Sequence, residues 1–114
     1  MIKTLGGRRL GRTGSHRRAM LRNMATSLFL HEKVESTVAN CKELRPFAEK
    51  LITDAKKGKH REVRRDVQNK DVFKKLFDIL VPRFQNRPGG YTQILRTRTR
   101  QGDNAELGMV RLIG

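Results

Sequence analysis

The sequence has no tryptophan, one tyrosine and one cysteine among its 114 residues. A single cysteine cannot form an internal disulfide, and no Cys or His cluster has the spacing of a zinc site. No stretch reaches the ~18 consecutive apolar residues of a membrane helix, and the first residues lack the apolar run of a secretory signal. We therefore expect a soluble, cytoplasmic protein without a cofactor, a metal, a small-molecule substrate or a membrane partner.

Acidic residues are scarce as well: 11 Asp and Glu stand against 26 Lys and Arg, which gives a formal net charge of +15. Residues 1–31 contain no acid and carry +7, and residues 79–102 contain five arginines and no acid, whereas residues 32–78 mix both signs and carry only +4. Like charges concentrated in two segments repel each other unless a polyanion neutralises them. The charge pattern favours nucleic acid as the partner, with these two segments as contact surfaces.

What is present suffices for one modest core, because 36% of the residues are hydrophobic. Helical periodicity predicts helices over 16–30, 44–55, 59–68 and 72–80, and β-branched alternation with turn signals predicts strands over 33–38, 91–100 and 105–113. We expect an α+β fold, a single domain (15–114) of about four helices packed on a small mixed sheet of about three strands. A basic flexible N-terminal arm (1–14) precedes it.

Local signals predict where the helices begin and end. Ser15, Thr37 and Asp71 are expected N-caps, because their side-chain oxygens can accept from the first amides of a helix. Pro46 predicts a bend near residues 42–46 or a later helix start, and Pro82 predicts the end of the helix that precedes it.

The arm at residues 1–14 contains four glycines and few apolar side chains. Ordering it would cost on the order of 15 to 25 kcal/mol with little apolar burial to offset that cost. We interpret it as a basic segment that becomes ordered in an RNA groove, where glycine permits close approach of the backbone.

Catalytic candidates are few. His16 or His31 would have to serve as the general base of a small basic nuclease, and neither belongs to a recognisable catalytic motif. Cys41 is interpreted as a small helix-face residue and not as a reactive thiol. A nucleic-acid-processing enzyme and a non-specific nucleic-acid-binding protein are the alternatives to a specific RNA-binding protein.

Tyr91 follows a glycine pair within the second basic segment. Its ring can stack on an unpaired base or pack into the sheet, and the sequence does not separate these two possibilities. The small number of aromatic residues argues against a sequence-specific reader of single strands and favours readout of phosphates and shape.

Three separated blocks resemble one known family. GRRLGRTGSHRRAMLRNMATSL (7–28) is similar to the opening signature of the bacterial large-subunit ribosomal protein seventeen family, and CKELRPFAEKLITDAK (41–56) resembles its second helix. RPGGYTQILRTRTRQGDNA (87–105) resembles its Gly-Gly-Tyr strand and Gly-Asp turn. Order and spacing agree over essentially the whole chain, although Ile2 and Lys3 depart from the usual start.

The resemblance implies a non-enzymatic, structural constituent of the large ribosomal subunit. It implies binding to 23S rRNA and to neighbouring ribosomal proteins close to the exit of the nascent-peptide tunnel. Charge and resemblance together give the candidate rRNA-binding residues Lys3, Arg8, Arg9, Arg12, Ser15, His16, Arg17, Arg18, Arg22, Asn23, Arg83, Arg87, Tyr91, Arg96, Arg98 and Arg100.

Overall fold

The computed structural model of the chain describes residues 14–114, so the predicted arm lies outside the described residues except for Gly14. Gly14 is the first residue of helix α1 (Gly14–His31). Ser15 is therefore already inside the first turn, and the prediction that it caps the helix is wrong, because an N-cap needs non-helical backbone angles.

Strand β1 (Lys33–Thr37) leads directly into helix α2 (Val38–Lys56). Thr37 caps α2 as predicted, because its hydroxyl oxygen accepts a hydrogen bond of 3.2 Å from the amide of Asn40. The predicted later start is wrong: α2 begins well before Pro46 and runs through it. Proline removes one backbone hydrogen bond, but buried residues on both sides of Pro46 hold the helix against the core.

The second half of the helical layer consists of α3 (His60–Asp66) and a longer helical segment made of α4 (Lys70–Lys75), the π-helical turn η1 (Leu76–Leu80) and α5 (Val81–Arg83). The N-cap of α4 is Asn69, and not Asp71 as predicted. The Asn69 side chain accepts from the amides of Asp71 at 2.9 Å and Val72 at 3.2 Å. Asp71 instead lies in the first turn, where a negative charge favours the helix dipole.

Pro82 does not end this segment, contrary to the prediction. In η1 the amide of Val81 bonds to the carbonyl of Leu76, five residues earlier, which is the wide hydrogen-bond pattern of a π turn. Pro82 then lies in the first turn of α5. Proline is tolerated there, because the amide groups of a first helical turn have no acceptor within the helix. The helical path therefore continues to Arg83.

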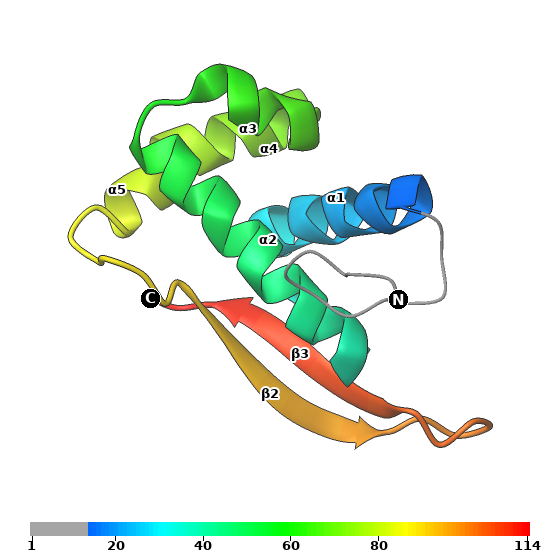
Figure 1. Ribbon diagram of the computed structural model, residues 1–114. Coiled ribbons are helices and arrows are strands. Elements are labelled where there is room, and N and C mark those ends of the chain that lie inside the picture. The colour runs from blue at the N-terminus through cyan, green and yellow to red at the C-terminus, as the bar shows by residue number, and fades with distance from the viewer. Residues whose placement is uncertain (1–13) are drawn as a thin grey trace, which may run out of the picture.

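The chain ends in a hairpin of β2 (Thr92–Thr99) and β3 (Glu106–Leu112), as predicted. The sheet order is β1-β3-β2, and both pairings are antiparallel, so the sheet is not mixed. A register irregularity between Arg96 and Arg98 marks a bulge in β2. Figure 1 shows the distal end of the hairpin extending past the helices.

The α+β class is confirmed, with α2 packed over one face of the sheet, α1 in contact with β1 and β3, and α3 and α4 farther from the sheet (Figure 1). Four core side chains without exposed surface come from different elements: Phe29 from α1, Ile52 from α2, Leu76 from η1 and Val110 from β3. Burial of apolar surface contributes about 25 cal/mol per Å², so this shared core stabilises the packing of the sheet against the helices. No helix among residues 14–114 is long and apolar enough to span a membrane.

Candidate nucleic-acid interface

Three predicted arginines of α1 are held by carboxylates of other helices. Arg17 donates to Glu43 of α2 at 2.7 Å. Arg18 and Arg22, four residues apart and so on one stripe of α1, both donate to the 7%-exposed Asp66 of α3. These ion pairs join three helices, yet the guanidinium groups of Arg18 and Arg22 keep 53% and 37% of their side-chain surface exposed.

The other candidates on α1 lie at the surface. Ser15 and His16 are exposed in the first turn, and Asn23 is exposed one turn after Ala19. Asn23 lines a shallow hollow together with Arg22 and the two residues that precede α4, Gln68 and Asn69. The beginning of α1 therefore places predicted polar and basic residues side by side.

Three further arginines of the second basic segment pair with carboxylates that lie outside the segment. Arg96 pairs with Glu106, and Arg98 with Glu35 at 3.3 Å. Arg100 pairs with Asp103 at 2.6 Å. The segment contains no acid in the sequence, but the fold brings one beside each of these three cations.

These contacts also set the acidity of the carboxyl groups. The hydrogen bond from Arg100 lowers the pKa of Asp103 to about 2, with the amide of Ala105 contributing. Hydrogen bonds from Thr97 and then Arg98 lower the pKa of Glu35. Both acids are therefore charged at neutral pH and partly neutralise the hairpin.

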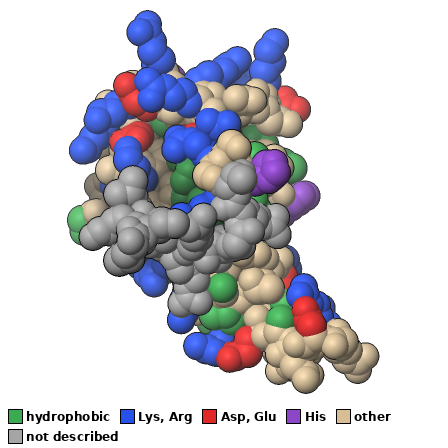
Figure 2. All heavy atoms as spheres, turned by 45° about the vertical axis from the view of Figure 1, so that its right-hand side comes forward, with side chains coloured by type: hydrophobic (Ala, Val, Ile, Leu, Met, Phe, Trp, Pro, Cys, Tyr) green, Lys and Arg blue, Asp and Glu red, His purple; other side chains and the backbone are tan. Residues whose placement is uncertain are grey.

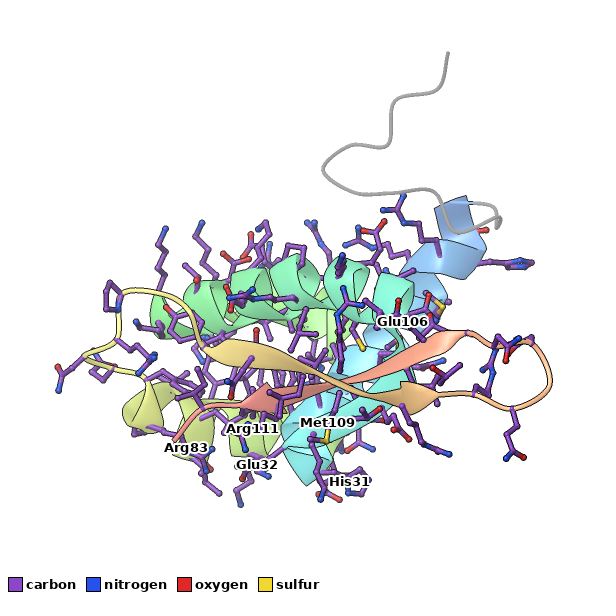
Figure 3. The ribbon with its side chains drawn as sticks, turned by 90° about the horizontal axis from the view of Figure 1, so that it is seen from below. His31, Glu32, Arg83, Glu106, Met109 and Arg111 are labelled. Atoms are coloured by element: carbon purple, nitrogen blue, oxygen red, sulfur yellow. The ribbon has the colours of Figure 1, made fainter. Side chains whose placement is uncertain are left out.

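Arg83, at the end of α5, makes a two-point contact with Glu32, its nitrogens lying 2.7 and 3.1 Å from the two carboxylate oxygens. Figure 3, which views the molecule from below, shows the two labelled side chains next to each other at one edge of the sheet. Lys75 adds a second cation at 3.3 Å. Hydrogen bonding to Arg83 is the main reason that the pKa of Glu32 falls to about 2.

A groove of about 660 Å³ lies where the loop before β2 meets the end of β3. It is lined by three arginines, namely Arg45 of α2, Arg87 of the loop and Arg111 of β3. The Nε atom of Arg87 donates to the carbonyl of Gly90 at 3.1 Å, and that of Arg111 to Gln93 at 3.0 Å. Sequence reasoning found Arg87 but missed the other two, since they come from elements far apart in the chain.

The ring of Tyr91 packs in the core, where the residue is 2% exposed and lies 5.1 Å from the ring of Phe84. Its hydroxyl oxygen accepts a hydrogen bond of 3.1 Å from Lys56. A ring covered in this way cannot stack on a base, so of the two possibilities for Tyr91 the structure supports packing. Its place among the candidate RNA contacts is corrected accordingly.

Sequence reasoning missed a third basic surface, which we name the α3 basic patch. Its seven members are exposed, and within residues 14–114 none of them pairs with a carboxylate. Two exposed acids, Glu62 and Asp71, lie in the same stretch. Figure 2 shows Lys and Arg side chains gathered at the end of the molecule that carries α3. The members are Lys57, Lys59, Arg61, Arg64, Arg65, Lys70 and Lys74.

The patch escaped notice because the middle of the chain sums to only +4. Two buried acids of this region pair with cations outside the patch: Asp66 binds Arg18 and Arg22, and Asp54 binds Lys50 at 2.9 Å. The positions of Arg61 and Arg65, four apart on one helix, were the only local signal.

The described residues show no arrangement for catalysis. No group of three or more His, Cys, Asp or Glu within residues 14–114 could hold a metal ion. Burial raises the pKa of the Cys41 thiol, which disfavours the reactive thiolate. His31 ends α1 beside Glu32, but that carboxylate is held by Arg83. Fold and surface define a small, strongly basic α+β protein.

Comparison with known proteins defines the family. The profile described as Ribosomal protein L17 matches residues 20–113. The large ribosomal subunit protein bL17 of Elusimicrobium minutum is 52% identical over 113 residues, which cover 99% of both chains. The bL17 protein of Endomicrobium trichonymphae is 49% identical over 116 residues, again 99% of each chain, and that of Halothermothrix orenii is 50% identical over 109 residues, 93% of this chain and 96% of its own.

The chain belongs to the ribosomal protein L17 family, which confirms the resemblance read from its three blocks. It is a non-enzymatic structural constituent of the large ribosomal subunit, a cytoplasmic particle in bacteria. The nuclease alternative with His16 or His31 as base is therefore wrong. Its partners are ribosomal RNA and ribosomal proteins.

Proposed function

We propose that this chain binds 23S rRNA close to the exit of the nascent-peptide tunnel and there contacts neighbouring large-subunit proteins. The observation that carries RNA binding is the surplus of charge, +15 over 114 residues, displayed on surfaces that come from several elements. The tunnel-exit position rests on the family resemblance of residues 7–28, 41–56 and 87–105.

The arm at residues 1–14 is proposed to enter an RNA crevice, and the domain at 15–114 to dock on folded RNA. The contacts assigned to the arm lie outside the described residues. The proposed contacts are Lys3, Arg8, Arg9, Arg12, Ser15, His16, Arg17, Arg18, Arg22, Asn23, Arg83, Arg87, Arg96, Arg98 and Arg100.

Existing ion pairs do not prevent such contacts. An exposed Arg–carboxylate pair contributes only about 0 to 1 kcal/mol in water. Arg96, Arg98 and Arg100 keep 61%, 66% and 49% of their side chains exposed, so each can exchange its carboxylate for a phosphate at small cost. The fork of arginine suits a phosphate as well as a carboxylate.

A salt titration tests the electrostatic part of this proposal. If about six phosphates are contacted, the affinity for 23S rRNA fragments should fall roughly 10³-fold between 50 and 200 mM salt. Filter binding or fluorescence anisotropy measures the dependence, with duplex DNA of equal length as the matched competitor. A flat curve would contradict the proposal, and equal affinity for both polymers would favour a non-specific binder.

Hydroxyl-radical footprinting on 23S rRNA tests the location. We expect the purified chain to protect a discrete set of nucleotides that border the tunnel exit. Protection spread evenly along the RNA, or confined to the opposite face of the subunit, would overturn the assigned position while leaving RNA binding intact.

A further inference from the structure

Three rings from α3, α4 and η1 form a stacked cluster beside the α3 basic patch. The imidazole of His60 lies parallel to the ring of Phe77, with 9° between the planes and 4.2 Å between the centroids. Phe73 packs at a tilt against Phe77, with a centroid distance of 4.7 Å. A hydrogen bond of 2.9 Å between His60 Nδ1 and the carbonyl of Gly58 fixes the position of the imidazole.

This cluster is open to solvent on one side. His60 is exposed and Phe73 and Phe77 are half-buried. A hollow of about 580 Å³ lies against the cluster and is lined by His60, Arg61, Arg64, Arg65 and Phe73.

The chemistry of the lining selects its occupant. The guanidinium of Arg64 lies 5.0 Å from the centre of the Phe73 ring, so a flat cation and flat rings border the same space. No carboxylate lines the hollow, and none pairs with Arg61, Arg64 or Arg65 within the described residues. Flat stacking surfaces next to arginines match an unpaired nucleobase and its flanking phosphates, whereas an acidic peptide would use the cations but leave the rings without a partner.

We propose that this hollow is a stacking site for one unpaired RNA base, with the ring of His60 as the platform and Arg61 and Arg65 on the neighbouring phosphates. The inference rests on the proposed RNA-binding function and adds to it a surface that lies outside the two acid-free segments.

The test uses the full chain and two RNA hairpins, one fully paired and one that differs only in a single bulged 2-aminopurine nucleotide, whose fluorescence falls on stacking. We expect wild type to bind the bulged hairpin more tightly and to quench it. His60→Ala should weaken binding to the bulged hairpin about 5-fold or more and abolish quenching, with less than about 2-fold effect on the paired hairpin.

Two variants make the result specific. His60→Phe keeps a flat ring and should restore tight binding and quenching. Such a restoration would show that the alanine variant loses binding because the ring is absent. His31→Ala removes another exposed histidine, at the end of α1, and should change neither property.

Failure of the inference and failure of the proposed function give different results. Steeply salt-dependent binding of both hairpins without quenching, or equal behaviour of wild type and His60→Ala, would overturn the stacking site alone. Loss of binding in His60→Phe equal to that in the alanine variant would also overturn it. Absence of binding to any rRNA fragment would remove the proposed function. A poly-glutamate peptide that binds wild type but not His60→Ala would assign the hollow to an acidic protein partner instead.

Discussion

At the scale of single residues, Glu32 combines a left-handed backbone conformation with a carboxylate that binds two cations. Its backbone has φ of 66°, in the left-handed region that non-glycine residues rarely occupy. This turn between α1 and β1 directs its carboxylate to Arg83 and Lys75, which come from the far end of the helical layer. One side chain thus ties the start of the sheet to the end of the helices.

Glu32→Gln should lower the stability of the domain in a pH-dependent way. The folded pKa is about 2 against an ordinary 4.5, so the ion pairs stabilise the fold fully above about pH 5 and lose that effect as the pH falls through 2. At pH 7 we expect a loss of about 1 kcal/mol, reduced by solvent screening because the carboxylate is 37% exposed. Urea unfolding at pH 7, 4 and 2.5 measures the difference between the two proteins.

Glu106→Gln is the matched control. Both side chains of the Arg96–Glu106 pair are largely exposed, so this pair should contribute almost nothing to the stability of the domain. A difference between wild type and Glu32→Gln that stays constant down to pH 2 would show that the ion pairs are not its cause.

At the scale of elements, the sheet and helix α2 approach each other closely at Gly108 of β3. A Cβ built there would lie 3.2 Å from the carbonyl oxygen of Leu95 and 3.3 Å from Cγ2 of Val38. The absence of a side chain is therefore what lets the start of α2 approach the middle strand.

Gly108→Ala should destabilise the domain by about 1 to 3 kcal/mol, the usual cost of overpacking a closed interface. Gly89→Ala, in the loop before β2 with nothing within 4 Å of the added carbon, should stay within about 0.5 kcal/mol of wild type. Chemical denaturation of both variants checks the pair. Equal losses of stability at the two positions would mean that the close approach of α2 to β3 does not explain the effect of Gly108→Ala.

The elements were largely predictable because their hydrophobic periods are strong: the stripe of α2 and the alternation in the hairpin stand out in the sequence. Errors occurred where a local signal competed with tertiary packing. Pro46 and Pro82 favour breaks, yet core contacts on both sides keep α2 continuous, and η1 widens the turn before α5. Asn69 and Asp71 are both good caps, and only the backbone path decides between them.

The stacking cluster was not predictable. His60 and the pair Phe73 and Phe77 belong to different helices, and the sequence gives no sign that they meet. The scarcity of aromatic residues argued against any stacking platform, because composition counts rings but does not show where they gather.

At the scale of the whole molecule, the domain and the arm are proposed to have separate roles. Deleting residues 2–13 should leave the melting temperature of the domain within about 2 °C of wild type, because the arm has few apolar side chains to bury. For a domain of this size, a loss of 1 kcal/mol in stability lowers the melting temperature by only a few degrees. RNA affinity should fall, and the slope of log affinity against log salt should decrease by about 0.7 to 0.9 for each lost phosphate contact. Calorimetry and the salt titration measure the two effects.

A full-length variant with Lys3, Arg8, Arg9 and Arg12 replaced by glutamine separates charge from chain length. It should reproduce the reduced slope while retaining the arm. A large drop in melting temperature on deletion would show instead that the arm is part of the folded core.

The sequence by itself determined the α+β class, most of the elements, the excess of positive charge and the family, because hydrophobic period, net charge and motif order are properties of the linear chain. Only the tertiary structure decided which cations are paired, since Arg18 and Asp66 are 48 positions apart and Arg98 and Glu35 are 63 apart. The same folding buried the ring of Tyr91 and gathered the α3 basic patch. Ion pairs form between groups that are close in space, and these groups come close only when the chain has folded.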